Sequence, residues 1–108
     1  MSNARVLNSP LSIFNNGTVS DRAVTVSSTA ANLITGTALN ATTTHILWTC
    51  TDANVRFTID GSTPTATVGH QVAAGQSGIW CAKMATQAKV IREGSTDASI
   101  FISEVVYL

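Results

Sequence analysis

The side chains best suited to chemistry are few and widely spaced along this chain of 108 residues. Its two histidines, His45 and His70, and its two cysteines, Cys50 and Cys81, are the residue types that bind zinc. Structural zinc sites take four ligands, which usually come in local pairs such as CxxC or HxxxH. The sequence contains no such pair, so it predicts no metal site and no bound cofactor.

A nucleophile, a base and an orienting carboxylate could be drawn from a serine, His70 and Asp60. Serines are abundant, however, and no G-x-S-x-G elbow surrounds any of them. The carboxylates form no close pair suited to acid–base work, and all but Glu104 lie in or beside predicted turns, where Asp caps the backbone. The carboxylates considered are Asp52, Asp60, Glu93, Asp97 and Glu104. We therefore expect no catalytic residues and no enzyme activity.

The composition excludes several classes of partner. Charged residues make up 11% of the chain, and six basic residues balance six acidic ones. A nucleic-acid partner requires a basic patch, and a membrane span requires 18 or more apolar residues; neither is present. No secretory signal is visible, so we expect synthesis in a reducing cytosol, with Cys50 and Cys81 as buried free thiols. A surface with so little charge favours packing against neighbours.

The stretch Val55–Gly75, VRFTIDGSTPTATVGHQVAAG, organises the chain. Val55, Phe57 and Ile59 alternate as the buried face of a strand, and turns follow at residues 60–64 and 74–75. The long loop Gly61–Gly69 is the predicted contact surface, because loops of this length on a β scaffold usually bind or pack against something. We expect Asp60 and a hydrogen-bonding His70 to hold it. The predicted interaction residues are Asp60, Gly61, Ser62, Thr63, Pro64, Thr65, Gly69 and His70. The glycines at 61, 69, 75 and 78 mark positive φ or close approach.

Strands are predicted on both sides of this stretch, at residues 23–26, 31–34, 45–50, 88–92 and 98–108. Ile46, Trp48 and Cys50 share one face of their strand, while Leu47 on the other face allows a strand covered on both sides. The connection at residues 51–54 predicts a hairpin with the strand that starts at Val55. In the last strand the apolar parity switches, which indicates a bulge near residues 103–104 or burial on both faces. Residues 82–87 could form a helical turn.

Residues 1–22 differ from the rest of the chain. Short apolar groups are separated by turn residues, and the segment is too apolar for a free disordered tail. It is predicted to be an extended arm that lies either on its own domain or on a neighbouring subunit. Its candidate interaction residues are Val6, Leu7, Leu11, Ile13 and Phe14.

The periodicities together predict an all-β fold. Val, Ile and Thr dominate, helical periodicity is absent, and turn signals recur at short intervals. The expected architecture is an antiparallel β-sandwich or jelly-roll-like single domain over residues 23–108, preceded by the arm. Trp48 and Trp80 lie on apolar strands, where core packing is the simpler interpretation. Exposed indoles would instead indicate a carbohydrate-binding module.

Residues 56–70, RFTIDGSTPTATVGH, resemble a segment of small virion structural proteins of tailed bacteriophages. In that family a strand of the type v-R-y/f-t-x-D-G-t-x-P-T leads into G-h-x-x-x-a-G. A later A-x-x-I-R strand and a final strand ending in Val-x-Tyr match residues 88–92 and 105–107 here. Residues 24–33, VTVSSTAANL, resemble the opening strand. The resemblance covers roughly residues 23–108 and not the arm, and Gln71-Val72 stands where relatives often carry Leu.

The resemblance implies a non-enzymatic virion component without cofactors. It indicates a capsid decoration (cement) protein that bridges major capsid proteins on the head surface, assembled in the host cytoplasm. It also implies a homo-oligomer, with a trimer favoured. A tail, fibre or baseplate accessory protein is the alternative within the virion. The expected partners are the major capsid protein or another virion protein.

Overall fold

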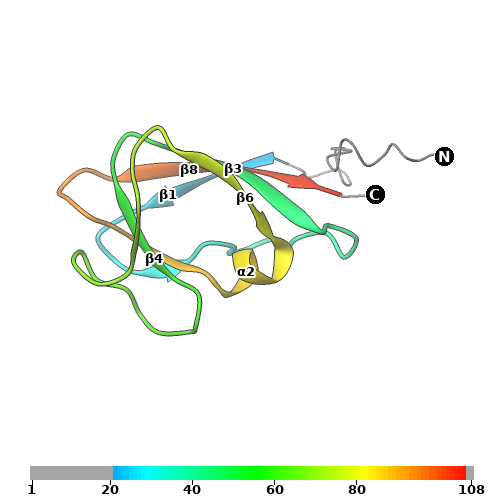
Figure 1. Cartoon of the computed structure of the whole chain (residues 1–108), viewed down its shortest axis with the longest axis horizontal. Coiled ribbons are helices and arrows are strands. Elements are labelled where there is room, and N and C mark those ends of the chain that lie inside the picture. Colours follow the sequence, from blue (N-terminus) through cyan, green and yellow to red (C-terminus); the bar gives the residue numbers. More distant parts are fainter. Residues whose placement is uncertain (1–20, 107–108) are drawn as a thin grey trace.

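The computed structural model describes residues 21–106, which fold into two four-stranded sheets packed face to face. Figure 1 shows the β1-β8-β3-β6 sheet in the upper part of the view, with β4 and α2 below it. The other sheet has the strand order β2-β7-β4-β5. The strands are β1 Asp21–Val26, β2 Ala31–Asn32, β3 His45–Thr51, β4 Val55–Thr58, β5 His70–Val72, β6 Ser77–Cys81, β7 Lys89–Arg92 and β8 Ala98–Val105. Neighbouring strands pair antiparallel. The predicted all-β antiparallel sandwich is confirmed.

The core lies between the sheets and follows the period-two alternation of the strands. Ile46, Trp48 and Cys50 point inward from β3, and Val55 and Phe57 point inward from β4. The inward positions of β8 are also buried, beginning with Ala98, Ile100 and Ile102. Alternation in the sequence therefore identified the inner faces of β3 and β4 correctly. Ile59 is the exception, because β4 ends at Thr58 and Ile59 is 38% exposed.

The predicted hairpin between β3 and β4 is wrong. β3 pairs with β6 and β8, whereas β4 pairs with β5 and β7 in the opposite sheet. The connection is a corner that carries the chain from one layer to the other. Asp52 adopts a left-handed φ of 76°, and the Ala53 N–H donates to the Thr51 carbonyl at 2.9 Å. Strand–turn–strand patterning is the same for a hairpin and for a corner, so it could not separate them.

β3 and β8 show how the outer face differs from the core. Leu47 is 37% exposed, so β3 is covered on one side only. β8 pairs with β3 continuously from Ser99 to Val105, without a bulge. Glu104 and Val105 are both buried, at 1% exposure each, although they point to opposite faces of the strand. The parity switch in the sequence therefore reflects burial on both faces.

The domain boundary predicted between residues 22 and 23 lies too late in the chain. Asp21 and Arg22 are already part of β1, where they pair with Ser103 and Ile102 of β8. The alternation that begins at Ala23 concealed this, because Asp21 and Arg22 are polar. The candidate arm residues at positions 6, 7, 11, 13 and 14 lie outside the described residues, as do residues 107 and 108.

A short helix, α2 (Ala82–Gln87), follows β6. It confirms the helical turn that the sequence allowed at residues 82–87. The Cys81 sulfur caps it by accepting the Met84 N–H at 3.5 Å. Cys81 is exposed, so the prediction of two buried thiols holds only for Cys50. The reason is parity: Cys81 shares the outward face of β6 with Ile79, at the end of an edge strand.

Candidate functional site

The turn after β4 is held by its own side chains. The Ser62 N–H and hydroxyl both donate to Asp60 Oδ1, at 3.0 and 2.5 Å. The Thr58 hydroxyl donates to the Ser62 carbonyl at 2.6 Å. The Ser62 hydroxyl and backbone N–H hold the pKa of the Asp60 carboxyl below its ordinary value. Asp60 therefore caps a turn, as its position in the sequence indicated.

The predicted interaction loop separates into a lined depression and a projecting tip. A shallow depression of about 300 Å³ is lined by Thr58, Ile59, Asp60, Ser62, Gly69 and His70. Pro64 is fully buried, while Gly61, Thr63 and Thr65 are exposed outside the depression. Val68 at the tip is 60% exposed, the largest value among the exposed large hydrophobic residues of the described chain. Val68 lies within the predicted contact loop Gly61–Gly69, although it is not among the interaction residues predicted individually.

Within the part of the chain that the structure describes, the His70 ring makes none of the hydrogen bonds predicted for it. Its ring packs against Phe57, with the ring centroids 5.2 Å apart and the planes inclined at 39°. Asp60 accepts hydrogen bonds from Ser62 and not from His70. The serine, His70 and Asp60 are thus close in space without the relay that nucleophilic catalysis requires. Within residues 21–106, no group of three His, Cys, Asp or Glu side chains is placed to hold a metal ion.

Gly69 lets the loop return to the sheet. Its φ is +136°, and a Cβ atom there would lie 2.9 Å from the Phe57 carbonyl oxygen. Gly78 has a different role, because a Cβ there would lie 3.0 Å from the Trp48 ring. Both positions confirm the prediction that these glycines mark positive φ or close approach.

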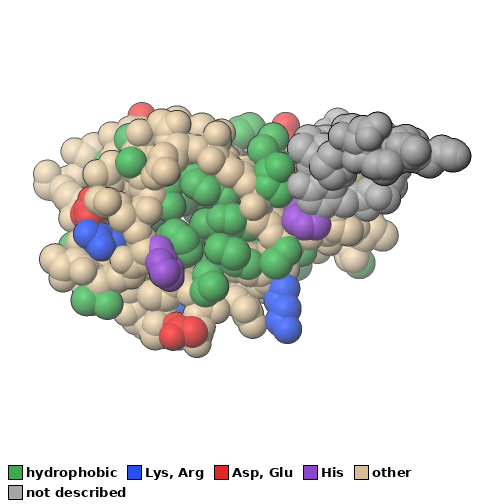
Figure 2. Space-filling model, viewed as in Figure 1, with side chains coloured by type: hydrophobic (Ala, Val, Ile, Leu, Met, Phe, Trp, Pro, Cys, Tyr) green, Lys and Arg blue, Asp and Glu red, His purple; other side chains and the backbone are tan. Residues whose placement is uncertain are grey.

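The two tryptophans pack into an aromatic row that joins the sheets. Trp80 lies 5.2 Å from Trp48 and 4.8 Å from Phe57, measured between ring centroids. Trp48 is only 7% exposed, and Trp80 is partly buried against the core. Figure 2 shows hydrophobic side chains gathered in the middle of the view, between β4 and the β6–α2 segment. Trp48 is therefore a core residue, and Trp80 packs against the core while part of it stays exposed.

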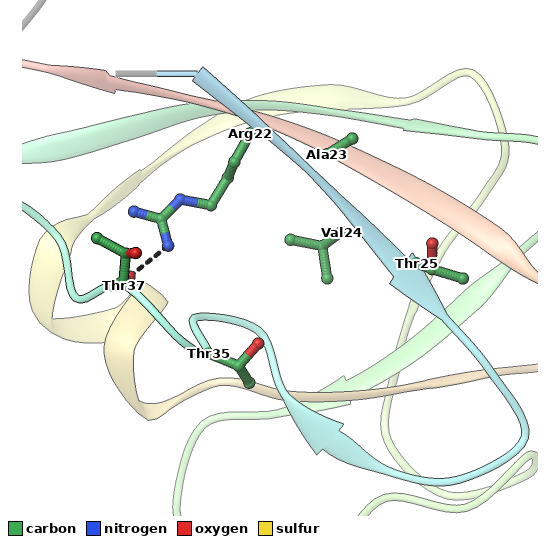
Figure 3. Close-up of a pocket in the computed structure, with 6 residues that line it drawn as sticks. All are labelled: Arg22, Ala23, Val24, Thr25, Thr35 and Thr37. Carbon is green, nitrogen blue, oxygen red and sulfur yellow. Dashed lines mark hydrogen bonds between the residues drawn. The ribbon is translucent and has the colours of Figure 1, made fainter. Parts of the chain in front are cut away.

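A second depression, of about 330 Å³, lies beside the edge strand β1 (Figure 3). Arg22 and Val24 point from β1 toward Thr35 and Thr37 of the β2–β3 connection, whereas Ala23 points away. The Arg22 guanidinium donates to the Thr37 carbonyl and also pairs with Glu104. The cationic group in this depression is therefore already used in holding the fold.

The outer face of the β2-β7-β4-β5 sheet is charged. Glu93, just after β7, accepts hydrogen bonds from Asn54 at 3.1 Å, Arg56 at 2.8 Å and Gln71 at 2.8 Å. These donors, led by Gln71, hold the pKa of Glu93 below its ordinary value. The network ties β4, β5 and β7 together across their outer surface. Nothing in the sequence pointed to it, because its members are far apart along the chain.

The outer face of the β1-β8-β3-β6 sheet is almost uncharged. We call the three rows of residues named in the next sentence the neutral face. In register, the first row is Thr25, Ser99 and Thr51; the second is Ala23, Phe101, Thr49 and Ser77; the third is Asp21, Ser103, Leu47 and Ile79. Phe101 is 49% exposed and Leu47 37%. Asp21, at the corner, carries the face's one charge within the described chain. The one sign of this face in the sequence was Phe101, a large apolar residue that alternates with the inward-facing Ile100 and Ile102 and must therefore point outward.

The comparisons with known proteins give no relatives. No protein-family model matches the chain, and neither a curated protein nor a solved structure shows significant similarity to it. Across residues 21–106, no helix has the length and apolar character needed to cross a bilayer.

Proposed function

We propose that this protein is a non-enzymatic structural component of a tailed-phage virion, acting as a capsid decoration protein. The observation that carries the proposal is the neutral face, on which Phe101 and Leu47 stand among hydroxylic side chains. Covering such a face with protein buries apolar area and desolvates only the charge of Asp21 at its corner, and charged groups are depleted in the cores of protein interfaces. The neutral face therefore favours a structural protein that functions as part of an assembly.

A decoration protein that bridges other subunits needs at least two contact surfaces. The neutral face lies on the β1-β8-β3-β6 sheet, and the loop with Val68 at its tip connects β4 to β5 in the other layer. Contacts on opposite layers suit bridging between neighbours. The virion as the setting and the major capsid protein as the partner are inferred from the resemblance of residues 56–70 and 88–92 to phage virion proteins. A homo-oligomer on the head surface, assembled in the host cytoplasm, belongs to the same proposal.

Co-expression with the major capsid protein encoded in the same genome tests this function. Shells purified by sedimentation should carry the protein at a fixed stoichiometry, and cryo-electron microscopy should place it on the outer head surface. Val68→Asp in the loop tip should lower occupancy, whereas Lys89→Gln on the charged outer sheet should leave it unchanged. Shells that bind none of the protein would overturn the proposal. Density on the tail instead of the head would replace it with the accessory-protein alternative.

Removal of the arm tests its part in the attachment. The cut should fall after residue 20 and not after residue 22, because Asp21 and Arg22 belong to β1. The shortened protein should lose capsid occupancy while keeping the tryptophan emission of the folded core. Full occupancy of the shortened protein would show that the arm has no role in attachment.

A further inference from the structure

The neutral face is too small to hold a partner domain on its own. Four strands spaced about 4.8 Å apart and rows spaced about 6.7 Å apart give it a footprint of roughly 400 Å². Stable protein interfaces bury about 800 Å² on each partner. A flat docking of two such faces would therefore be weak. An occupant that crosses this face and then continues onto further surface would meet the requirement.

We propose that residues 1–20 of a second copy of this chain lie across the neutral face, with their apolar side chains seated on Phe101 and Leu47. The inference deepens the assembly role proposed above and rests on it, but it concerns contacts between copies of this chain. It assigns the neutral face and residues 1–20 to contacts between copies, so that the joined copies, each through its loop around Val68, bridge the other virion protein.

The length of the N-terminal segment and its point of attachment support this occupant. Residues 1–20 join the fold at Asp21, the first residue of β1, which is an edge strand at a corner of the neutral face. Twenty extended residues reach about 66 Å, several times the width of the face. The segment can therefore leave its own domain and cross the neutral face of another. Two copies placed corner to corner could exchange segments reciprocally.

The chemistry of the segment matches that of the face. Residues 1–20 contain one charged side chain, Arg5, and the face contains one of opposite sign, Asp21. The remainder of both is apolar, hydroxylic or amide. Contact between them therefore buries Phe101 and Leu47 against the apolar groups of the segment without leaving a charge unpaired. Ile13 and Phe14 form the largest adjacent apolar pair in the segment.

Self-association of the purified full chain, without any virion, is the test. Light scattering coupled to size exclusion should show an oligomer at high concentration that dissociates on dilution. Phe101→Asp on the face and Phe14→Asp in the segment should each weaken association by at least about tenfold, as expected for central interface residues. Val68→Asp, an equally drastic change on an exposed apolar residue of the other layer, should leave it unchanged. Phe101→Thr gives a second face variant, since threonine suits a strand. Tryptophan emission and thermal unfolding report whether each variant is folded.

Mixing the two variants identifies the pair of surfaces. The Phe14→Asp chain keeps an intact face and the Phe101→Asp chain keeps an intact segment, so their mixture should form a hetero-oligomer that neither forms alone. A wild-type chain that stays monomeric at every concentration would overturn the proposal. So would a Phe14→Asp chain that associates as well as wild type, because the faces would then meet without the segment. These results are independent of capsid binding, so failure here and failure of the virion role can be told apart.

Discussion

Arg22 Nη2 lies 3.1 Å from Glu104 Oε2, and the two side chains are only 14% and 1% exposed. The other Glu104 oxygen accepts the Asn40 N–H at 2.8 Å and the Thr43 hydroxyl at 2.6 Å. Arg22 in turn donates to the Thr37 carbonyl. A single buried carboxylate therefore joins the first strand, the last strand and the β2–β3 connection. Its position explains why an acidic residue stands at an inward position of β8, in line with Ile100 and Ile102.

Removal of the Arg22 charge should be costly. Arg22→Met keeps much of the packing volume but leaves the Glu104 carboxylate buried without its cation, a situation that costs about 3–5 kcal/mol. Asp97→Asn is the matched control, because it breaks the pair between Arg92 and an Asp97 that is 50% exposed. Exposed pairs contribute less than about 1 kcal/mol. Urea unfolding followed by tryptophan fluorescence measures both. Equal losses in the two variants would mean that water reaches Glu104.

Gly69 should tolerate no side chain. In Gly69→Ala the new Cβ meets the Phe57 carbonyl oxygen at 2.9 Å, and the φ of +136° is strained for any L residue. We expect a loss of about 1–3 kcal/mol in the free energy of unfolding. Gly94→Ala is the control, since no atom lies within 4 Å of its Cβ position. That change should be neutral or stabilising by up to about 1 kcal/mol. A harmless Gly69→Ala would show that the loop can shift away from β4.

The fold class could be predicted because alternation is a local property. The inner face of β3 can be identified from the alternation of Ile46, Trp48 and Cys50 alone, without knowledge of any other strand. The partners of β3 and β4 could not be predicted, because they depend on whether residues 51–54 form a hairpin or a corner. Asp52, with its left-handed φ, makes the corner, and Asp tolerates that conformation in either arrangement.

The candidate site was predictable in part for the same reason. The turn chemistry at Asp60 and the glycine at 69 act locally, and both were identified correctly. The neutral face emerges only when β1, β8, β3 and β6 are placed side by side, since Leu47 and Phe101 are 54 positions apart in number yet lie on adjacent strands. Lateral order of strands is set by long-range packing, which no short window of sequence contains.

Glu93 should make stability depend on acid pH. Hydrogen bonds from Gln71, Arg56 and Asn54 lower its pKa in the folded state below the ordinary value of 4.5. A lowered folded pKa contributes stability that is complete above pH 4.5 and is lost as the pH falls through the folded pKa. Glu93→Gln should therefore flatten the loss of stability over that range, as measured by urea unfolding at several pH values. An unchanged pH profile in this variant would contradict the network.

The same network can be tested at its main donor. Gln71→Ala removes the largest cause of the lowered Glu93 pKa, so the carboxyl should titrate closer to its ordinary value in carbon-detected NMR. Gln87→Ala, in the exposed last position of α2, serves as the control and should leave the titration unchanged. If Gln71→Ala has no effect on that titration, Arg56 and Asn54 suffice to hold the charge of Glu93.

The two cysteines should differ sharply in reactivity. The Cys50 thiol is fully buried, and burial, followed by the nearby Asp52 charge, raises its pKa. Cys81 is exposed at the start of α2. Because the thiolate is the reacting species, a thiol-specific chromogenic disulfide should modify Cys81 quickly and Cys50 only as the fold opens. Cys81→Ser should abolish the fast phase and Cys50→Ala should keep it, with both thiols reacting quickly in denaturant. A fast phase that survives Cys81→Ser would mean that the corner at residues 51–54 opens readily, and would weaken the assignment of that corner as a rigid link between the sheets.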